Sequence, residues 1–181
     1  MRAIGVLGAV STAAAVLGSL GLSAQASASN YGVELNGTYR VISNGDWATT
    51  SAGPFGQGGA QVFIDQPTVV QTWTITSSCT SPIRCSGTVT SDQGWSSPVS
   101  TTGDYWVVDH FVENWLPCPD GTVVPGAQKF LFWGWNPVAS DRDMRYNDVM
   151  PGRDRTQAAS GACGQNKSVV TEYPLRLEKV S

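Results

Sequence analysis

The chain after residue 29 alternates apolar and polar side chains with a period of two, which is the pattern of β-strands with one buried face. In segment 69–76, the odd positions carry Val, Gln, Trp and Ile, whereas three of the four even positions carry Thr. Helical spacing of apolar residues is nearly absent from this region. The pattern predicts strands over 35–43, 61–64, 69–76, 87–91, 105–112, 130–135, 169–173 and 175–177.

The segments between these strands are rich in turn-forming residues. Asn-Gly-Asp at 44–46 follows the first strand, a glycine-rich loop spans 52–59, and Pro174 interrupts the last run. A proline inside a strand pattern indicates a sheet edge or a bulge. We therefore expect an all-β domain, an antiparallel meander of about seven or eight strands that closes as a barrel or folds as a sandwich.

The N-terminus has the three parts of a Sec signal peptide. Arg2 gives a basic start, residues 3–22 carry no charge, and segment 23–28 offers two small-x-small cleavage sites. A transmembrane anchor is the alternative, but four glycines and several Ser and Thr dilute the apolar run. We predict a signal peptide over 1–28, cleaved after Ala26 or Ala28. A single secreted β domain over 29–181 then has no membrane span left.

The secreted domain is mildly acidic. Loss of Arg2 with the signal peptide changes the formal charge from −3 to −4. Nucleic acids and anionic membrane surfaces select for an excess of Lys and Arg. The charge therefore argues against both as the main partner.

All four cysteines lie in the exported part, and an even number in an oxidising compartment predicts two disulfides. Cys79 and Cys85 flank a short turn with a proline, so the arms of a hairpin would bring them within bridging range. Cys118 then pairs with Cys163. The sequence has no Cys-x-x-Cys and one histidine, so we expect no metal site, and nothing in it indicates a cofactor.

The seven tryptophans all lie in the exported part, where they serve either the core or a ligand platform. Those within predicted strands are assigned to the core: Trp73, Trp106 and Trp133. Those beside turn residues are expected to be more accessible: Trp47, Trp95 and Trp115. We predict that the second group binds a ligand, by stacking on sugar rings or by lining a barrel mouth.

Catalytic signatures are weak, and no catalytic residue is predicted. His110 follows Asp109 on a strand, but neighbouring strand residues point to opposite faces and cannot form a bonded pair. His110 shares its face with Trp106 and Val108, so we expect it to be packed among apolar neighbours. No Gly-x-Ser-x-Gly elbow is present. For a hydrolase, the candidate acids are Asp104, Asp109 and Glu113.

Segment 141–148 has the acidic content of a calcium loop. It lacks the glycine and closing glutamate of an EF-hand, and Arg142 and Arg145 would repel a cation. We expect local ion pairs on an exposed hairpin instead. The same polar character continues through 151–155.

Several stretches resemble small exported proteins of mycobacteria and related actinobacteria. They are segment 73–79 with the paired Cys85, the turn at 117–121 and the turn at 158–164. The resemblance covers most of the exported chain and implies export and the cysteine framework, but no reaction. The barrel architecture also resembles lipocalins, whose early Gly-x-Trp is echoed at 45–47. Here that triplet follows a strand instead of opening one, so the likeness stays at the level of architecture.

Three functions fit these observations. We favour a secreted, non-enzymatic β domain that binds a ligand or a cell-envelope component, because scaffold, disulfides and aromatic content all suit binding. A hydrolase of envelope polymers is the second, and carboxylates converging in a cleft would favour it. The third is a structural or host-interaction surface protein without a small ligand.

Overall fold

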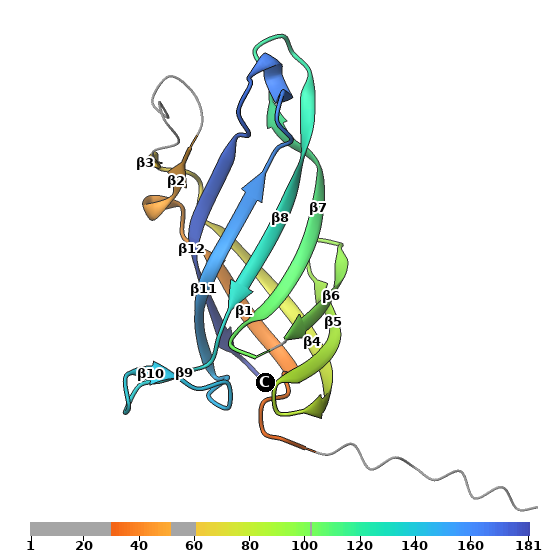
Figure 1. The fold of residues 1–181 in the computed structure, drawn as a ribbon, viewed down its shortest axis with the longest axis vertical. Helices are drawn as coiled ribbons and strands as arrows, with labels where there is room; N and C mark the ends of the chain where they lie inside the picture. Colours follow the sequence, from red (N-terminus) through yellow and green to blue (C-terminus); the bar gives the residue numbers. More distant parts are fainter. Residues whose placement is uncertain (1–29, 52–60, 102) are drawn as a thin grey trace, which may run out of the picture.

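The computed structural model describes residues 30–51, 61–101 and 103–181, which form a closed antiparallel β-barrel (Figure 1). Eight strands follow one another in the order β1-β4-β5-β6-β7-β8-β11-β12, and β12 pairs with β1 to close the sheet. Their bounds are β1 Gly37–Ser43, β4 Val69–Ser81, β5 Arg84–Ser91, β6 Ser96–Thr101, β7 Trp106–Pro117, β8 Val123–Phe132, β11 Val149–Gln157 and β12 Val170–Lys179. The predicted all-β antiparallel architecture is confirmed, with the barrel as its form.

Short elements decorate the barrel. Strands β2 (Thr49–Thr50) and β3 (Val62–Phe63) extend the sheet outward from β12, and β9 (Trp135–Asn136) and β10 (Asp141–Arg142) form a separate hairpin. The described residues also include two 3₁₀ turns, η1 (Gly45–Trp47) and η3 (Ala162–Gly164). The predicted signal peptide 1–28 and the glycine-rich loop 52–59 lie outside the described residues.

The lower half of the barrel, in the orientation of Figure 1, is filled by large apolar side chains. Inward positions of the alternating strands bury Tyr39, Trp73, Trp106, Phe130 and Phe132, all 0% exposed. The segment that precedes β1 and the loop after β10 pack against this core through Val33, Leu35 and Met144. The lower end is therefore plugged, and apolar burial there supplies the main stabilising term.

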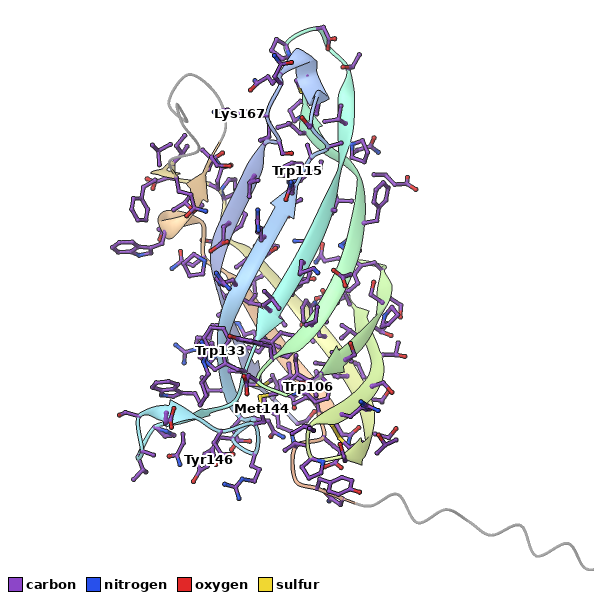
Figure 2. All side chains as sticks on the ribbon, in the orientation of Figure 1. Trp106, Trp115, Trp133, Met144, Tyr146 and Lys167 are labelled. Atoms are coloured by element: carbon purple, nitrogen blue, oxygen red, sulfur yellow. A yellow bond between two sulfur atoms is a disulfide. The ribbon has the colours of Figure 1, made fainter. Side chains whose placement is uncertain are left out.

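The prediction that Trp133 belongs to the core is wrong. Phe130 and Phe132 take the inward positions of β8, so the next residue, Trp133, faces outward. Trp133 is half-buried beside the β9–β10 hairpin, apart from Trp106 inside the barrel (Figure 2). Its ring packs edge-on against Tyr105 and lies 4.2 Å from the guanidinium carbon of Arg142, a cation–π contact.

Pro174, where the sequence predicts a sheet edge or a bulge, instead lies inside the sheet, beside a gap between β1 and β2, and its pairing with β11 has no shift in register. Strand β12 pairs with β11 along its length and, on its other side, with β1 over 175–179 and with β2 over 171–172. The Pro174 carbonyl accepts from the Asn44 backbone N–H at 2.9 Å, on the β1 side. A residue's N–H and C=O point to the same neighbouring strand, so the missing N–H of proline costs no bond to β11.

Both predicted disulfides are present. Cys79 and Cys85 are directly opposed on β4 and β5, with Cα atoms 4.0 Å apart. Cys118, which follows β7, is joined to Cys163 in the β11–β12 connection, with Cα atoms 5.1 Å apart. The second bond ties together the upper tips of two hairpins that are distant in sequence.

The two disulfides should differ in their contribution to stability. They close loops of 45 and 6 residues, and the longer loop restricts the unfolded chain more. Replacing Cys118 and Cys163 by Ser should lower the free energy of unfolding by about 4 kcal/mol, and replacing Cys79 and Cys85 by about 2 kcal/mol. Urea unfolding of both double variants measures this, and a larger loss from the short loop would contradict it.

Candidate functional site

Buried polar side chains gather at the upper end of the barrel interior, opposite the plugged end. The set is Ser43, Gln71, Ser91, Asp154 and Thr156, each at most 5% exposed. They continue the inward-facing alternation of the strands, which lower in the barrel buries aromatic residues. Burial of polar groups is costly unless they are hydrogen-bonded, and the Ser91 hydroxyl accordingly donates to Gln71 Oε1 at 2.8 Å.

Asp154 is the ionisable centre of this region. The Ser43 hydroxyl donates to Asp154 Oδ2 at 2.7 Å, and Gln128 Nε2 donates to Oδ1 at 2.8 Å. Burial raises the pKa of Asp154 to about 6, although both hydrogen bonds and the nearby His110 act to lower it. Tyr173 lies opposite Asp154 on β12, and burial together with the Asp154 charge raises the pKa of its phenol.

Asp154 also determines, through Gln128, which ring nitrogen of His110 carries the proton. A carboxylate accepts hydrogen bonds, so it holds the amide nitrogen of Gln128 and leaves the amide oxygen to face the imidazole. That oxygen, Oε1, lies 2.9 Å from His110 Nδ1. Nδ1 must therefore carry the proton, and in neutral His110 the other nitrogen, Nε2, is an acceptor. Within the described part of the chain Nε2 has no hydrogen-bond partner.

Trp95 forms an aromatic wall for this site. Its ring stacks on His110 with centroids 4.3 Å apart and an interplanar angle of 19°, and it contacts Trp73 edge-on at 5.5 Å. It faces inward and is half-buried, so it is less accessible than its place beside a turn indicated. We call Ser43, Trp95, His110, Gln128 and Asp154 the mouth cluster.

Trp115 lies farther up the same inner face, where Figure 2 places it near the top of the barrel. It belongs to β7, at an irregularity between Val112 and Leu116, and not to a turn. A Cβ on Gly126 would lie 2.8 Å from its ring and 2.6 Å from Thr156 Cγ2, so this glycine is what lets the indole lie close to the sheet.

Trp47 is placed elsewhere. It is 63% exposed on the outside of the barrel, where its ring meets Phe63 edge-on at 6.3 Å. The structure therefore directs two of the three predicted ligand-binding tryptophans, Trp95 and Trp115, toward the barrel interior and leaves the third on the outer surface.

The inner face opens to solvent at this end. Along β7, Trp106 and Val108 are fully buried, whereas the next inward residues, His110 and Val112, are half-buried. On β12, Tyr173 is likewise half-buried above two buried leucines. Strands β7, β8, β11 and β12 continue upward past β5 and β6 (Figure 1).

A groove of about 690 Å³ lies over the upper parts of β7, β8 and β11. Phe111, Ala127 and Arg155, which alternate with the inward residues of the mouth cluster, line it, and Ala159 lines it from the loop above. Phe111 is 62% exposed. This groove is a second, more apolar surface on the same three strands.

The cluster lacks the order of a catalytic triad. The Ser43 hydroxyl donates to Asp154, and Gln128 separates Asp154 from His110, so His110 does not contact the serine. A triad needs the histidine between the two. Among the acids named for a hydrolase, Asp109 faces outward and pairs with Lys129 Nζ at 3.2 Å, while Asp104 and Glu113 are exposed.

The acidic segment at 141–148 forms one local ion pair, whereas its other arginine, Arg142, makes the cation–π contact described above. Asp143 holds Arg145 through two hydrogen bonds of 2.7 and 2.9 Å. The Arg145 side chain in turn lowers the pKa of Asp143. Within residues 30–51, 61–101 and 103–181, no group of three or more His, Cys, Asp or Glu side chains is arranged to hold a metal ion.

Sequence reasoning missed Asp154 and Gln128. Asp154 lies between two arginines, and this pattern indicates a polar surface segment. Instead it is strand β11, in which Arg153 and Arg155 point outward and Asp154 inward. The signal that could have found it is the period-two run of Met150, Gly152, Asp154 and Thr156.

Comparisons with known proteins show similarity at the level of fold. No protein-family model matches the chain, and no curated protein matches it. A solved structure, the monomer form of the Mycobacterium tuberculosis PknI sensor domain, has a TM-score of 0.50 and 14% sequence identity, covering 82% of this chain and 88% of that one. In the described part of the chain, no helix has the length and apolar character needed to span a membrane.

The pKa of Asp154 sets the sign of a pH dependence. The carboxyl ionises near 3.8 in the unfolded chain and near 6 in the native one, so stability falls as pH rises between these values. The full penalty above pH 6 is about 3 kcal/mol. Asp154→Asn should therefore be more favourable relative to the parent at pH 7.5 than at pH 4, by about 2 kcal/mol, because part of the penalty is already present at pH 4.

Urea unfolding at the two pH values measures the difference. Thr156→Val is the matched control, because it alters a buried neighbour on the same face without a titrating group and should shift stability equally at both. An Asp154→Asn effect that is the same at pH 4 and pH 7.5 would contradict the assignment.

Proposed function

We propose that this chain is an exported, non-enzymatic binding domain that takes a small polar ligand, or a polar group of a cell-envelope component, at the mouth of its barrel. The observation that carries the proposal is the change of the inner face from fully buried aromatics to half-buried hydrogen-bonding and aromatic groups. Ligand sites of proteins combine apolar walls with a few convergent polar groups in this way.

The mouth cluster, together with Trp115 above it, supplies both kinds of contact. Trp95, stacked on His110, and Trp115, over Gly126, offer aromatic surface for a ring or chain. His110 Nε2 offers an acceptor for a ligand hydroxyl or N–H. Because Asp154 and Gln128 already fix the imidazole, its side chain loses little conformational freedom when a ligand binds.

Two further observations support a binding role outside the cell. Two disulfides suit an oxidising compartment, and the N-terminal pattern suits export. The structural neighbour is named as a sensor domain, a role that consists of binding. Trp47 and Phe63 remain an outer surface on which an envelope polymer could alternatively stack.

The test is binding of defined probes to protein purified from culture medium, with its mass confirming a start after Ala26 or Ala28. Soluble peptidoglycan fragments, neutral envelope oligosaccharides and polar envelope lipids in micelles are titrated into ¹⁵N-labelled protein. One class should shift the signals of Trp95, His110 and Tyr173. His110→Ala and Trp115→Ala should weaken that binding about tenfold or more, the loss expected for one buried contact.

Phe111→Ala is the matched control, since it removes the neighbouring side chain on the outer face of the same strand. It should leave the affinity unchanged. Binding that depends on Phe111 would place the ligand in the outer groove, and binding that depends on Trp47 would place it at β3. Either result, or turnover of a probe, would overturn the mouth as the binding site.

A further inference from the structure

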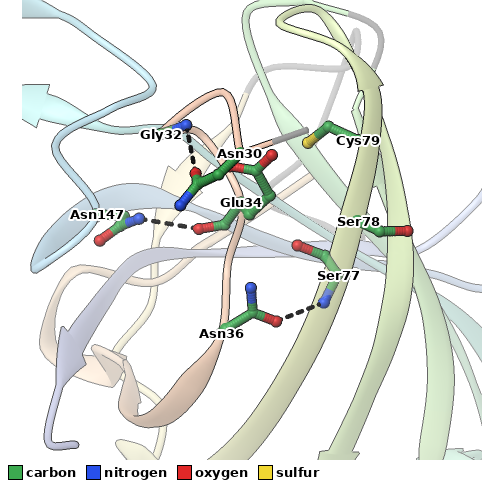
Figure 3. Close-up of a pocket in the computed structure, with 8 residues that line it drawn as sticks. All are labelled: Asn30, Gly32, Glu34, Asn36, Ser77, Ser78, Cys79 and Asn147. Atoms are coloured by element: carbon green, nitrogen blue, oxygen red, sulfur yellow. Dashed lines mark hydrogen bonds between the residues drawn. The ribbon is translucent and has the colours of Figure 1, made fainter. Parts of the chain in front are cut away.

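A second pocket, of about 360 Å³, lies at the plugged end of the barrel and is independent of the mouth (Figure 3). The segment before β1 forms one wall, and the end of β4 forms another. Amide and hydroxyl side chains dominate its lining, and Glu34 is its one charged residue; the residues used below are Asn30, Glu34, Asn36, Ser77 and Asn147.

Hydrogen bonds build this pocket into the fold. The Leu35 backbone N–H donates to Ser77 Oγ at 2.8 Å, and the same hydroxyl donates to the Leu35 carbonyl at 3.0 Å. The Ser77 N–H donates to Asn36 Oδ1 at 2.9 Å, and Asn147 Nδ2 donates to the Glu34 carbonyl at 3.1 Å (Figure 3). Segment 30–36 is therefore held to β4 and to the loop before β11.

Only one of the two carboxylate oxygens of Glu34 accepts a hydrogen bond within the described part of the chain. Its Oε1 accepts from the Tyr31 N–H at 2.9 Å, whereas Oε2 is buried without a hydrogen-bond partner among the described residues. Burial raises the pKa of Glu34, but backbone N–H groups of residues 31–34 outweigh this and lower it overall. The group is thus an anion at neutral pH, with one oxygen that lacks a donor.

No cation within the described part of the chain pairs with Glu34. Arg145 approaches the segment at Gly32, but its guanidinium is engaged by both oxygens of Asp143. A carboxylate oxygen removed from water gains most from a charged donor. The neighbouring side-chain oxygens of Asn30, Asn36 and Ser77 each accept one backbone N–H, and each keeps a second lone pair for the further N–H groups of such a donor.

We propose that this pocket binds a primary ammonium group on Glu34. A compact ammonium suits the site better than a planar guanidinium, because a bidentate guanidinium engages both carboxylate oxygens at once and Oε1 already accepts from the Tyr31 N–H. Two sources carry this chemistry. One is an amine of an external ligand, and the other is the α-ammonium group that removal of the predicted signal peptide would create a few residues before Glu34.

The test uses the chain from residue 29 to 181, once with a free α-amine and once N-acetylated. Each form is titrated with n-butylamine, which is cationic at pH 7.5, and with n-butanol, its neutral analogue. Amide signals of Asn30, Asn36 and Ser77 are followed by NMR. The amine should shift them saturably in at least the acetylated form, and the alcohol should not.

The two forms distinguish the sources. Binding of the amine to both forms assigns the pocket to an external ligand. Binding to the acetylated form alone, together with a higher melting temperature of the free-amine form, assigns it to the α-ammonium group of the chain. In either case Glu34→Gln should weaken amine binding about tenfold or more. Glu178→Gln, which alters the ion pairs of Glu178 with Arg40 and Arg176, should not.

The parent protein alone keeps the proposal falsifiable if Glu34→Gln does not fold. Equal responses to n-butylamine and n-butanol, or no saturable response in either form, would overturn it. Because the pocket lies at the opposite end of the barrel from the mouth cluster, these outcomes are independent of probe binding there.

Discussion

The pairing of β12 with β1 is the constraint on which the rest of this structure depends. It closes eight strands into a barrel, so every inward side chain must either pack against others or find a hydrogen-bond partner inside. The two ends solve this differently. Aromatic side chains and the segment before β1 fill the lower end, whereas the upper end carries polar groups bonded to one another. Closure thus separates a stabilising end from an end that can recognise a ligand.

Burial of the Asp154 carboxylate follows from that closure and organises the mouth. Desolvation keeps its pKa near 6, and the two donors that it recruits come from either side of β11: Gln128 from the adjacent β8 and Ser43 from β1, beyond β12. Gln128, oriented by Asp154, in turn orients His110 through the contact of its amide oxygen with Nδ1, and the His110 ring lies against Trp95. A costly buried charge is typical of a site kept for function rather than for stability. The arrangement suits recognition, since it fixes a single acceptor nitrogen in advance of binding.

Much of the fold could be predicted from the sequence, because period-two alternation and cysteine spacing are local signals. The positions of most strands, the antiparallel class and both disulfides followed from them, whereas β6 and β11 were not predicted. The wrong expectations, for Trp133 and Pro174, depended on which face and which partner a strand meets at its end, and this is decided by register across the barrel. The mouth cluster joins residues from β1, β7, β8 and β11, so no stretch of sequence displays it. Asp154 in particular is masked by its two arginine neighbours.

The tautomer of His110 tests the central claim most directly, because it depends on the whole path from Asp154 through Gln128. Long-range ¹H–¹⁵N NMR of imidazole-labelled protein at pH 7.5 reports which ring nitrogen carries the proton. We predict the Nδ1–H form, with Nε2 as the free acceptor, and a change in this pattern when Gln128 is replaced by Leu. A neutral imidazole protonated at Nε2 in the parent protein would contradict the account.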